Sequence, residues 1–107
     1  DDLYKICPTH ADAIHEYCFG TVWDRPNLDL KTREMIVMAA AAALDLPHEV
    51  GLHVRGALNR GANKDELIEV ILQCSPYIGF PKTNHALKAA QEIFDNWEKK
   101  KNDWKPL

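Results

Sequence analysis

Acidic, basic and imidazole side chains flank the most apolar segment of this chain, residues 35–44. Arg33 and Glu34 stand immediately before that segment. Glu49 and His53 follow it, four residues apart. On a helix this spacing puts both side chains on one face, so a carboxylate can orient or polarise an imidazole. Because low dielectric makes an unpaired charge costly and a pKa tunable, these residues are candidates for a proton-handling site.

Each candidate also has a structural interpretation. A Glu and His pair at helical spacing is commonly an exposed pair worth about 0.2–0.5 kcal/mol. Glu34, if it is buried, must be protonated or paired, and a salt bridge to Arg33 or Arg55 would pair it without any catalytic role. The two arginines have planar guanidinium groups suited to a carboxylate ligand, although an arginine on a helix is usually solvated. Spacing alone leaves these alternatives open.

The sequence supports other sites less well. Tyr77 lies next to a proline-containing turn at residues 76–81, where it could close a substrate pocket, although an aromatic side chain near a helix break is more often packing. The tryptophans are too scattered to define a site. The other four histidines have no second ligand at metal-binding spacing, so no metal site is predicted. They are His10, His15, His48 and His85.

The three cysteines, Cys7, Cys18 and Cys74, are odd in number and far apart, and they form no CxxC or zinc-finger pattern. We therefore expect reduced, mostly buried thiols in a cytoplasmic protein. No secretion signal is recognised, although the chain begins at Asp1 without a Met.

Length and composition indicate one globular domain over residues 1–107, with 46% apolar and 27% charged residues. The apolar segment is shorter than the roughly 17–25 residues that span a bilayer, so no membrane association is expected. A formal net charge of −3 argues against a nucleic-acid partner, because phosphate binding requires clustered Lys and Arg.

Apolar periodicity predicts helices and no strands, which gives an all-α fold with about five to six helices. A first helix is expected over residues 8–19, with Thr9 as its cap and Gly20 as its end. The second helix is expected to begin after Asp29 as N-cap and to end near Leu44. Its interior is apolar on every side, so it should be buried all round.

Three further helices complete the prediction. One begins at Pro47, ends at Gly61 and carries an apolar face. The next begins at a capping box formed by Asn63 and Glu66 and should end or kink at Pro76. The last spans about residues 82–99 and presents an apolar stripe of Leu87, Ala90, Phe94 and Trp97.

Four segments, in order, carry a resemblance to a known family: LDLKTREMIVMAAAAAL, HEVGLHVRGALNRGA, DELIEVILQ and PYIGFPKTNHA. Together they make the chain similar to the carboxymuconolactone decarboxylase family over about residues 19–94. The resemblance implies a compact helical subunit of the alkylhydroperoxidase D-like type. It also implies assembly into a homohexamer, and no metal or organic cofactor.

Alkylhydroperoxidase D, in the same superfamily, has a glutamate on the long apolar helix and a CxxCxxxH motif on the next. Carried over by position, the glutamate is Glu34 and the histidine is His53. The cysteine positions hold Leu46 and Glu49. Without these thiols, peroxide reduction lacks both its nucleophile and its resolving sulfur.

The decarboxylase branch implies conversion of 4-carboxymuconolactone to the enol-lactone of β-ketoadipate, a step of aromatic-compound catabolism in the β-ketoadipate pathway. Such a reaction needs cations for the substrate carboxylates and a positioned acid. Arg33 and Arg55 are assigned to the carboxylates and His53 to proton delivery, and Tyr77 to the pocket wall. Glu34 and Glu49 would hold and tune the imidazole.

Two other functions are compatible with the sequence. One is a thiol-dependent peroxide or disulfide reductase that uses Cys74 or Cys18. The other is a helical oligomer that binds a ligand without turnover, because a fold does not fix a substrate.

Overall fold

The computed structural model describes residues 2–103, with side chains described through residue 100. Regular structure in this range is helical, and no strand occurs in it. In chain order the elements are α1 (Asp2–Ile6), α2 (Pro8–Ala13), the π-helix η1 (Ile14–Val22), α3 (Leu30–Ala43), α4 (Pro47–Asn59), α5 (Lys64–Ile78) and α6 (Phe80–Asp103). The predicted all-α class is confirmed.

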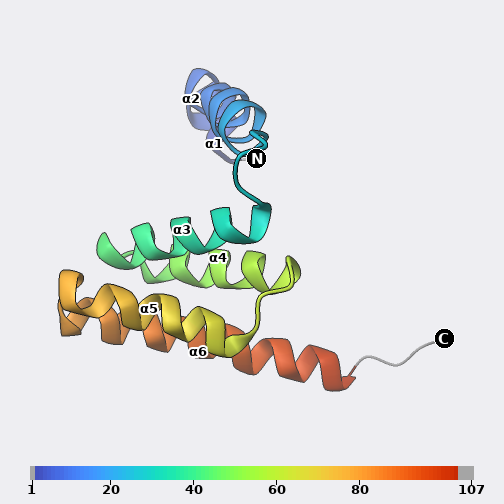
Figure 1. Cartoon of the computed structure of the whole chain (residues 1–107). Helices are drawn as coiled ribbons and strands as arrows, with labels where there is room; N and C mark the ends of the chain where they lie inside the picture. Colours follow the sequence, from blue (N-terminus) through green and yellow to red (C-terminus); the bar gives the residue numbers. More distant parts are fainter. Residues whose placement is uncertain (1, 104–107) are drawn as a thin grey trace.

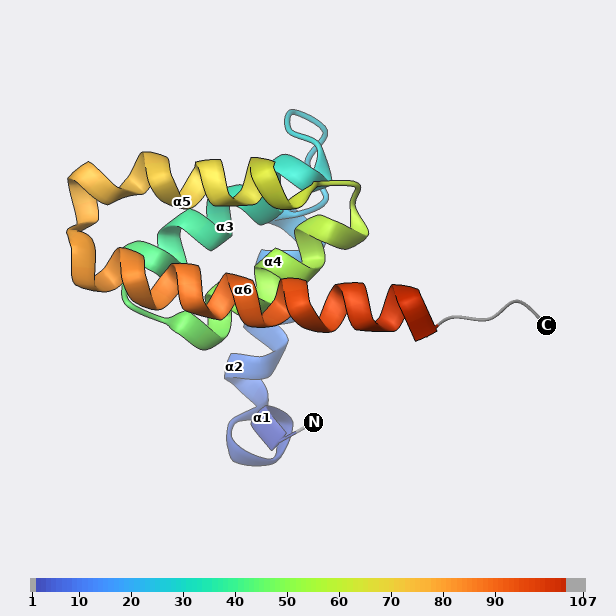
Figure 2. The same cartoon turned by 90° about the horizontal axis from the view of Figure 1, so that it is seen from below.

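Helices α3 to α6 form the body of the protein. The pair α3 and α4 lies over the pair α5 and α6 (Figure 1), and the far end of α6 extends beyond the other helices (Figure 2). Buried apolar side chains from all four helices, and Ala62 of the α4–α5 link, fill the interior. They are Met38, Ala41, Ala42, Val50, Val54, Ala57, Ala62, Leu67, Ile71, Ala86, Ala90 and Phe94. This core fixes α3 against α4.

The N-terminal segment, α1, α2 and η1, lies to one side of this body, to which residues 23–29 connect it (Figure 1). Ala11 is its one fully buried residue among those described. The segment therefore has almost no core of its own.

The sequence predicted one helix over residues 8–19. Its predicted N-cap, Thr9, and its predicted end, Gly20, are both wrong. Cys7 is the N-cap residue and no described side chain caps this helix, so Thr9 does not have that role. The helix widens into η1 and continues through Gly20. Its wider hydrogen bonding persists to the amide of Trp23, which donates to the carbonyl five residues earlier at 2.8 Å. With the backbone amides still paired, the glycine does not terminate the helix.

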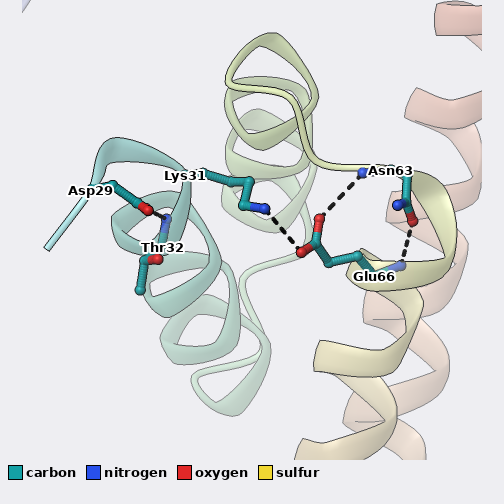
Figure 3. A network of polar contacts seen from close by, with 5 residues as sticks. All are labelled: Asp29, Lys31, Thr32, Asn63 and Glu66. Carbon is teal, nitrogen blue, oxygen red and sulfur yellow. Dashed lines mark hydrogen bonds and ion pairs between the residues drawn. The ribbon is translucent and has the colours of Figure 1, made fainter.

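Side-chain caps start α3 and α5, as predicted (Figure 3). Asp29 Oδ1 accepts a hydrogen bond from the Thr32 amide at 2.7 Å. Asn63 and Glu66 form the complete capping box. Lys31 Nζ lies 3.1 Å from Glu66 Oε2, so an ion pair ties the two helix starts together. These contacts set the register of α3 in the body.

Helix α4 agrees with the prediction at both ends. Pro47 lies in its first turn, where no amide donor is needed, and Gly61 follows its end with a φ of 96° that suits glycine. Val50, Val54 and Ala57 are buried on the face toward the core.

Pro76 does not end α5, which continues to Ile78 before Gly79. A proline leaves the carbonyl four residues earlier, that of Leu72, without its usual donor. The Ser75 hydroxyl donates to this carbonyl at 2.8 Å. The lost bond is thus replaced locally. Of the two outcomes expected at Pro76, an end or a kink, the end does not occur, and the helix runs two residues past the proline.

Helix α6 begins before the predicted residue 82, with Pro81 in its first turn. The expected apolar stripe is present: Ala90 and Phe94 are buried, and Leu87 and Trp97 are half-buried.

Two burial predictions are wrong. Helix α3 is not buried all round, because Ile36 is 51% exposed and Leu44, just after the helix, is 69% exposed. The thiols are free but not mostly buried: Cys7 is exposed, and Cys18 and Cys74 are half-buried. Of the helices described, none combines the length and apolar character needed to span a membrane.

Candidate functional site

A histidine and a buried glutamate from adjacent helices form the centre of the site. Glu34 of α3 is 8% exposed, and its Oε1 lies 2.8 Å from Nδ1 of His53 on α4. The two side chains are 11% and 24% exposed, respectively. Burial of the glutamate agrees with the sequence, but its partner is the imidazole and neither Arg33 nor Arg55. The pair joins residues 19 apart in the chain.

Gly56 gives the Glu34 carboxylate its place against α4. A Cβ atom built at residue 56 would overlap Oε2 of Glu34. The absence of a side chain therefore lets the carboxylate lie directly on the backbone of the helix that carries His53. This glycine could not be identified from the sequence, because its role depends on the packing of two helices.

Trp23 covers one face of the imidazole. The two rings are nearly parallel, with an interplanar angle of 19° and centroids 6.2 Å apart. Toward the N-terminus the row of rings continues through Phe19, His15 and Tyr4, with centroid separations of 6.4, 6.2 and 5.7 Å. The N-terminal segment is thus connected to the site by aromatic contacts, which the scattered tryptophans did not suggest from sequence.

Arg33 supports the link between the N-terminal segment and α3. Its Nη2 donates to the carbonyl of Arg25 at 2.9 Å, and its Nε is buried with no hydrogen-bond partner among the described residues. The Arg33 guanidinium therefore fixes the link that carries Trp23. Its buried Nε–H has no acceptor among the described residues.

The other three predicted residues lie on the protomer surface. Glu49 and Arg55 are exposed, and neither has a hydrogen bond or ion pair within the described part of the chain. Tyr77 is 82% exposed. The expected contact of Glu49 with His53 is not formed, because Nδ1 faces Glu34 on the neighbouring helix.

The described residues indicate no metal centre, and Cys74 is not an activated thiol. The described residues contain no group of three or more His, Cys, Asp or Glu side chains that could hold a metal ion. Cys74 lines an apolar hollow with Met35 and Ala39, and partial burial raises the pKa of its thiol. A raised pKa lowers the thiolate fraction, which makes this cysteine a poor nucleophile.

The Glu34 and His53 pair is suited to proton transfer. When the Glu34 carboxylate is ionised it only accepts hydrogen bonds, so Nδ1 donates to it. In that arrangement the neutral ring carries its proton on Nδ1, and Nε2 is left to exchange a proton with a ligand. Trp23 restricts the orientation of the ring.

Sequence comparison identifies the family. The profile of the carboxymuconolactone decarboxylase family matches residues 8–92. The chain belongs to this family. It is 42% identical to 4-carboxymuconolactone decarboxylase of Acinetobacter baylyi over 94 residues, which cover 88% of this chain and 70% of that protein. The resemblance noted from the sequence is confirmed.

Two further relatives of this carboxymuconolactone decarboxylase family member were found. Nitrosuccinic acid decarboxylase of Metarhizium robertsii is 34% identical over 79% of the chain and 59% of its own length. An uncharacterised protein of Paracoccus denitrificans is 37% identical over 86% and 70%. The two relatives named for an activity are both decarboxylases, in agreement with the expected enzyme of the carboxy-lyase class.

Proposed function

We propose that this protein decarboxylates 4-carboxymuconolactone to the enol-lactone of β-ketoadipate by acid-base catalysis, with His53 as the proton donor. The main observation that supports this proposal is the 2.8 Å contact of His53 Nδ1 with the buried Glu34 carboxylate. The name of the Acinetobacter relative supports the choice of substrate.

The reaction needs few groups from the protein. The bond between the ring carbon and its carboxylate breaks, carbon dioxide leaves, and the electron pair is delocalised through the unsaturated lactone as a dienolate. The lactone is therefore its own electron sink. His53 then gives the proton on Nε2 to a ring carbon, and solvent restores that proton. The negative charge of Glu34 stabilises the imidazolium form that donates, and a general acid of this kind contributes about 10²- to 10⁴-fold in rate.

Assembly into a homohexamer is part of the proposal. Several large apolar side chains are exposed on the protomer, among them Ile36, Leu44, Leu72, Tyr77 and Phe80. Apolar surface of this extent is typical of subunit contacts. Roles for Glu49, Arg55 and Tyr77 would follow if a neighbouring subunit completes the pocket around them.

Carbon dioxide release measured with purified protein and 4-carboxymuconolactone tests the proposal. One carbon dioxide should form for each lactone consumed, and nitrosuccinate serves as the comparison substrate. Failure to release carbon dioxide from the lactone would reject the assigned reaction.

Alkylation of the thiols separates the decarboxylase from a reductase that depends on Cys74 or Cys18. Iodoacetamide should leave carbon dioxide release unchanged, because neither thiol has a hydrogen bond to Glu34 or His53 in the described part of the chain. Loss of turnover on alkylation would instead support thiol chemistry. Tight binding of the lactone without any turnover would support the non-catalytic ligand-binding function.

A further inference from the structure

We propose that a hollow beside Trp23 binds the carboxylate that the substrate keeps, through the guanidinium groups of Arg25 and Arg60. This inference rests on the proposed function and deepens it by naming the residues that bind the retained carboxylate. The hollow has a volume of about 610 Å³ and lies where the link of residues 23–29 meets the end of α4.

Trp23 connects this hollow to the proton donor, since it lines the hollow and also stacks on His53. Arg60 follows His53 by seven residues, at the C-cap of α4. Two helical turns place it on the same face as the histidine and about 10 Å along the axis. In the proposal, the retained carboxylate lies in the hollow and the lactone ring lies beyond Trp23 toward the imidazole, which does not itself line the hollow.

The two arginines of the hollow have no partner among the described residues. Lys31 is bound to Glu66, whereas Asp29 accepts the Thr32 amide and keeps its negative charge. Outside the Lys31 ion pair, the lining therefore holds two carboxylates, Asp24 and Asp29, and two guanidinium groups, Arg25 and Arg60. Neither of these arginine side chains has a hydrogen bond or ion pair with another described residue.

Arg33 fixes the backbone of Arg25. Its guanidinium binds the backbone carbonyl of Arg25 at 2.9 Å, so the link is fixed while the Arg25 side chain remains unpaired at the hollow. Arg33 is thus a positioning residue in this proposal, and Arg25 takes the carboxylate-binding role that the sequence analysis gave to Arg33.

The chemistry also favours a cation at a distance from the imidazole. During decarboxylation, negative charge leaves the departing carboxylate and enters the ring. A guanidinium on that carboxylate would stabilise the substrate more than the transition state and slow the reaction. A guanidinium bound to the retained carboxylate keeps that ion pair in the bound substrate and in the transition state. It therefore contributes equally to the binding of both. Its removal should weaken binding and leave turnover almost unchanged.

Steady-state kinetics of Arg25→Gln and Arg60→Gln provide the test. Each variant should raise KM for the lactone about ten- to hundredfold, with kcat within about threefold of the wild type. Lys88→Gln, at an exposed position on α6, is the matched control and should change neither constant. An unchanged KM in both arginine variants would overturn the proposal.

A substrate that carries a methyl ester in place of the retained carboxylate sharpens this test. The wild type should handle the ester with a raised KM, and the arginine substitutions should add little further, because their partner is already gone. An ester whose KM responds to the substitutions as strongly as the KM of the dianion would overturn the assignment.

Direct binding keeps the inference separate from the proposed reaction. If the wild type releases no carbon dioxide, calorimetric titration with a saturated lactone bearing two carboxylates still probes the hollow. Weaker binding by Arg25→Gln and Arg60→Gln than by Lys88→Gln supports a carboxylate site. Equal affinity of the wild type and the three variants for this dicarboxylate, or no binding by the wild type, would exclude a carboxylate site in the hollow.

Discussion

Two histidines of this protein make the same contact in different surroundings. Nδ1 of His53 lies 2.8 Å from Glu34, and Nδ1 of His85 lies 2.8 Å from Asp45. The first pair is 24% and 11% exposed, whereas the second is 52% and 40% exposed. The distance is the same, so burial and neighbouring groups must decide whether such a pair can do chemistry.

The exposed pair has a structural explanation. Asp45 occupies the turn after α3 with a φ of 57°, and His85 reaches it from α6. At the same corner Lys82 donates to the carbonyl of Ala43 at 3.1 Å. These contacts fasten α6 to the end of α3. An ion pair this exposed is worth about 0–1 kcal/mol, so the pair is an internal control for the buried one.

The largest expected difference between the pairs is in turnover. His53→Ala should lower kcat about 10²- to 10⁴-fold, because the proton donor is removed. His85→Ala should leave kcat unchanged. Steady-state carbon dioxide release measures both. Equal effects of the two substitutions would show that the buried pair has no special role.

Replacing the carboxylates should give the second-largest difference. Glu34→Gln keeps an acceptor for Nδ1 but removes the charge that stabilises the imidazolium, so kcat should fall about 10²-fold. Asp45→Asn should have no effect on kcat. Circular dichroism of both variants controls for folding. Full activity of Glu34→Gln would mean that its charge takes no part in the reaction.

A smaller effect is expected from Gly56→Ala, which tests how the buried pair is held. The added methyl group would displace the Glu34 carboxylate and lower kcat about tenfold, which is less than the roughly 10²- to 10⁴-fold contribution of the proton donor itself, because the imidazole is still present. Gly51→Ala, on the same helix, is the matched control, because its Cβ would meet the Ile93 side chain at an ordinary 3.4 Å. A loss of kcat in Gly51→Ala as large as that in Gly56→Ala would attribute the effect to α4 in general.

The smallest expected effect is the change in the free energy of unfolding when the exposed pair of His85 and Asp45 is broken. His85→Ala should lower the free energy of unfolding by less than about 1 kcal/mol, as expected for a solvated ion pair. Urea denaturation followed by circular dichroism measures it. A loss of several kcal/mol would show that this corner is a major support of the fold.

Local signals in the sequence were sufficient for most of the helices. The caps at Asp29 and at Asn63 with Glu66 depend on residues three apart, so the sequence displays them directly. The prediction failed where another group compensated for a helix breaker. The Ser75 hydroxyl replaces the bond lost at Pro76, and the wider π-helical pairing continues past Gly20.

Only part of the candidate site could be predicted from the sequence, because several of its contacts join segments that are far apart in the chain. An isolated acid before ten apolar residues indicates burial, so Glu34 was identified. Its partner lies on another helix. Helical spacing pointed to Glu49 as the partner of His53, whereas the family resemblance assigned both Glu34 and Glu49 to the imidazole. Trp23 and Gly56 contribute through packing between segments, which a single sequence does not display.

The protonation of the His53 ring tests the central claim most directly. Long-range proton–nitrogen NMR correlations of histidine-labelled protein distinguish the two neutral tautomers. The structure predicts that, in the neutral ring of His53, the proton stays on Nδ1, facing Glu34, with Nε2 unprotonated and free to exchange with substrate. A ring protonated on Nε2 with an unprotonated Nδ1 would contradict the Glu34 contact and the proton-transfer role built on it.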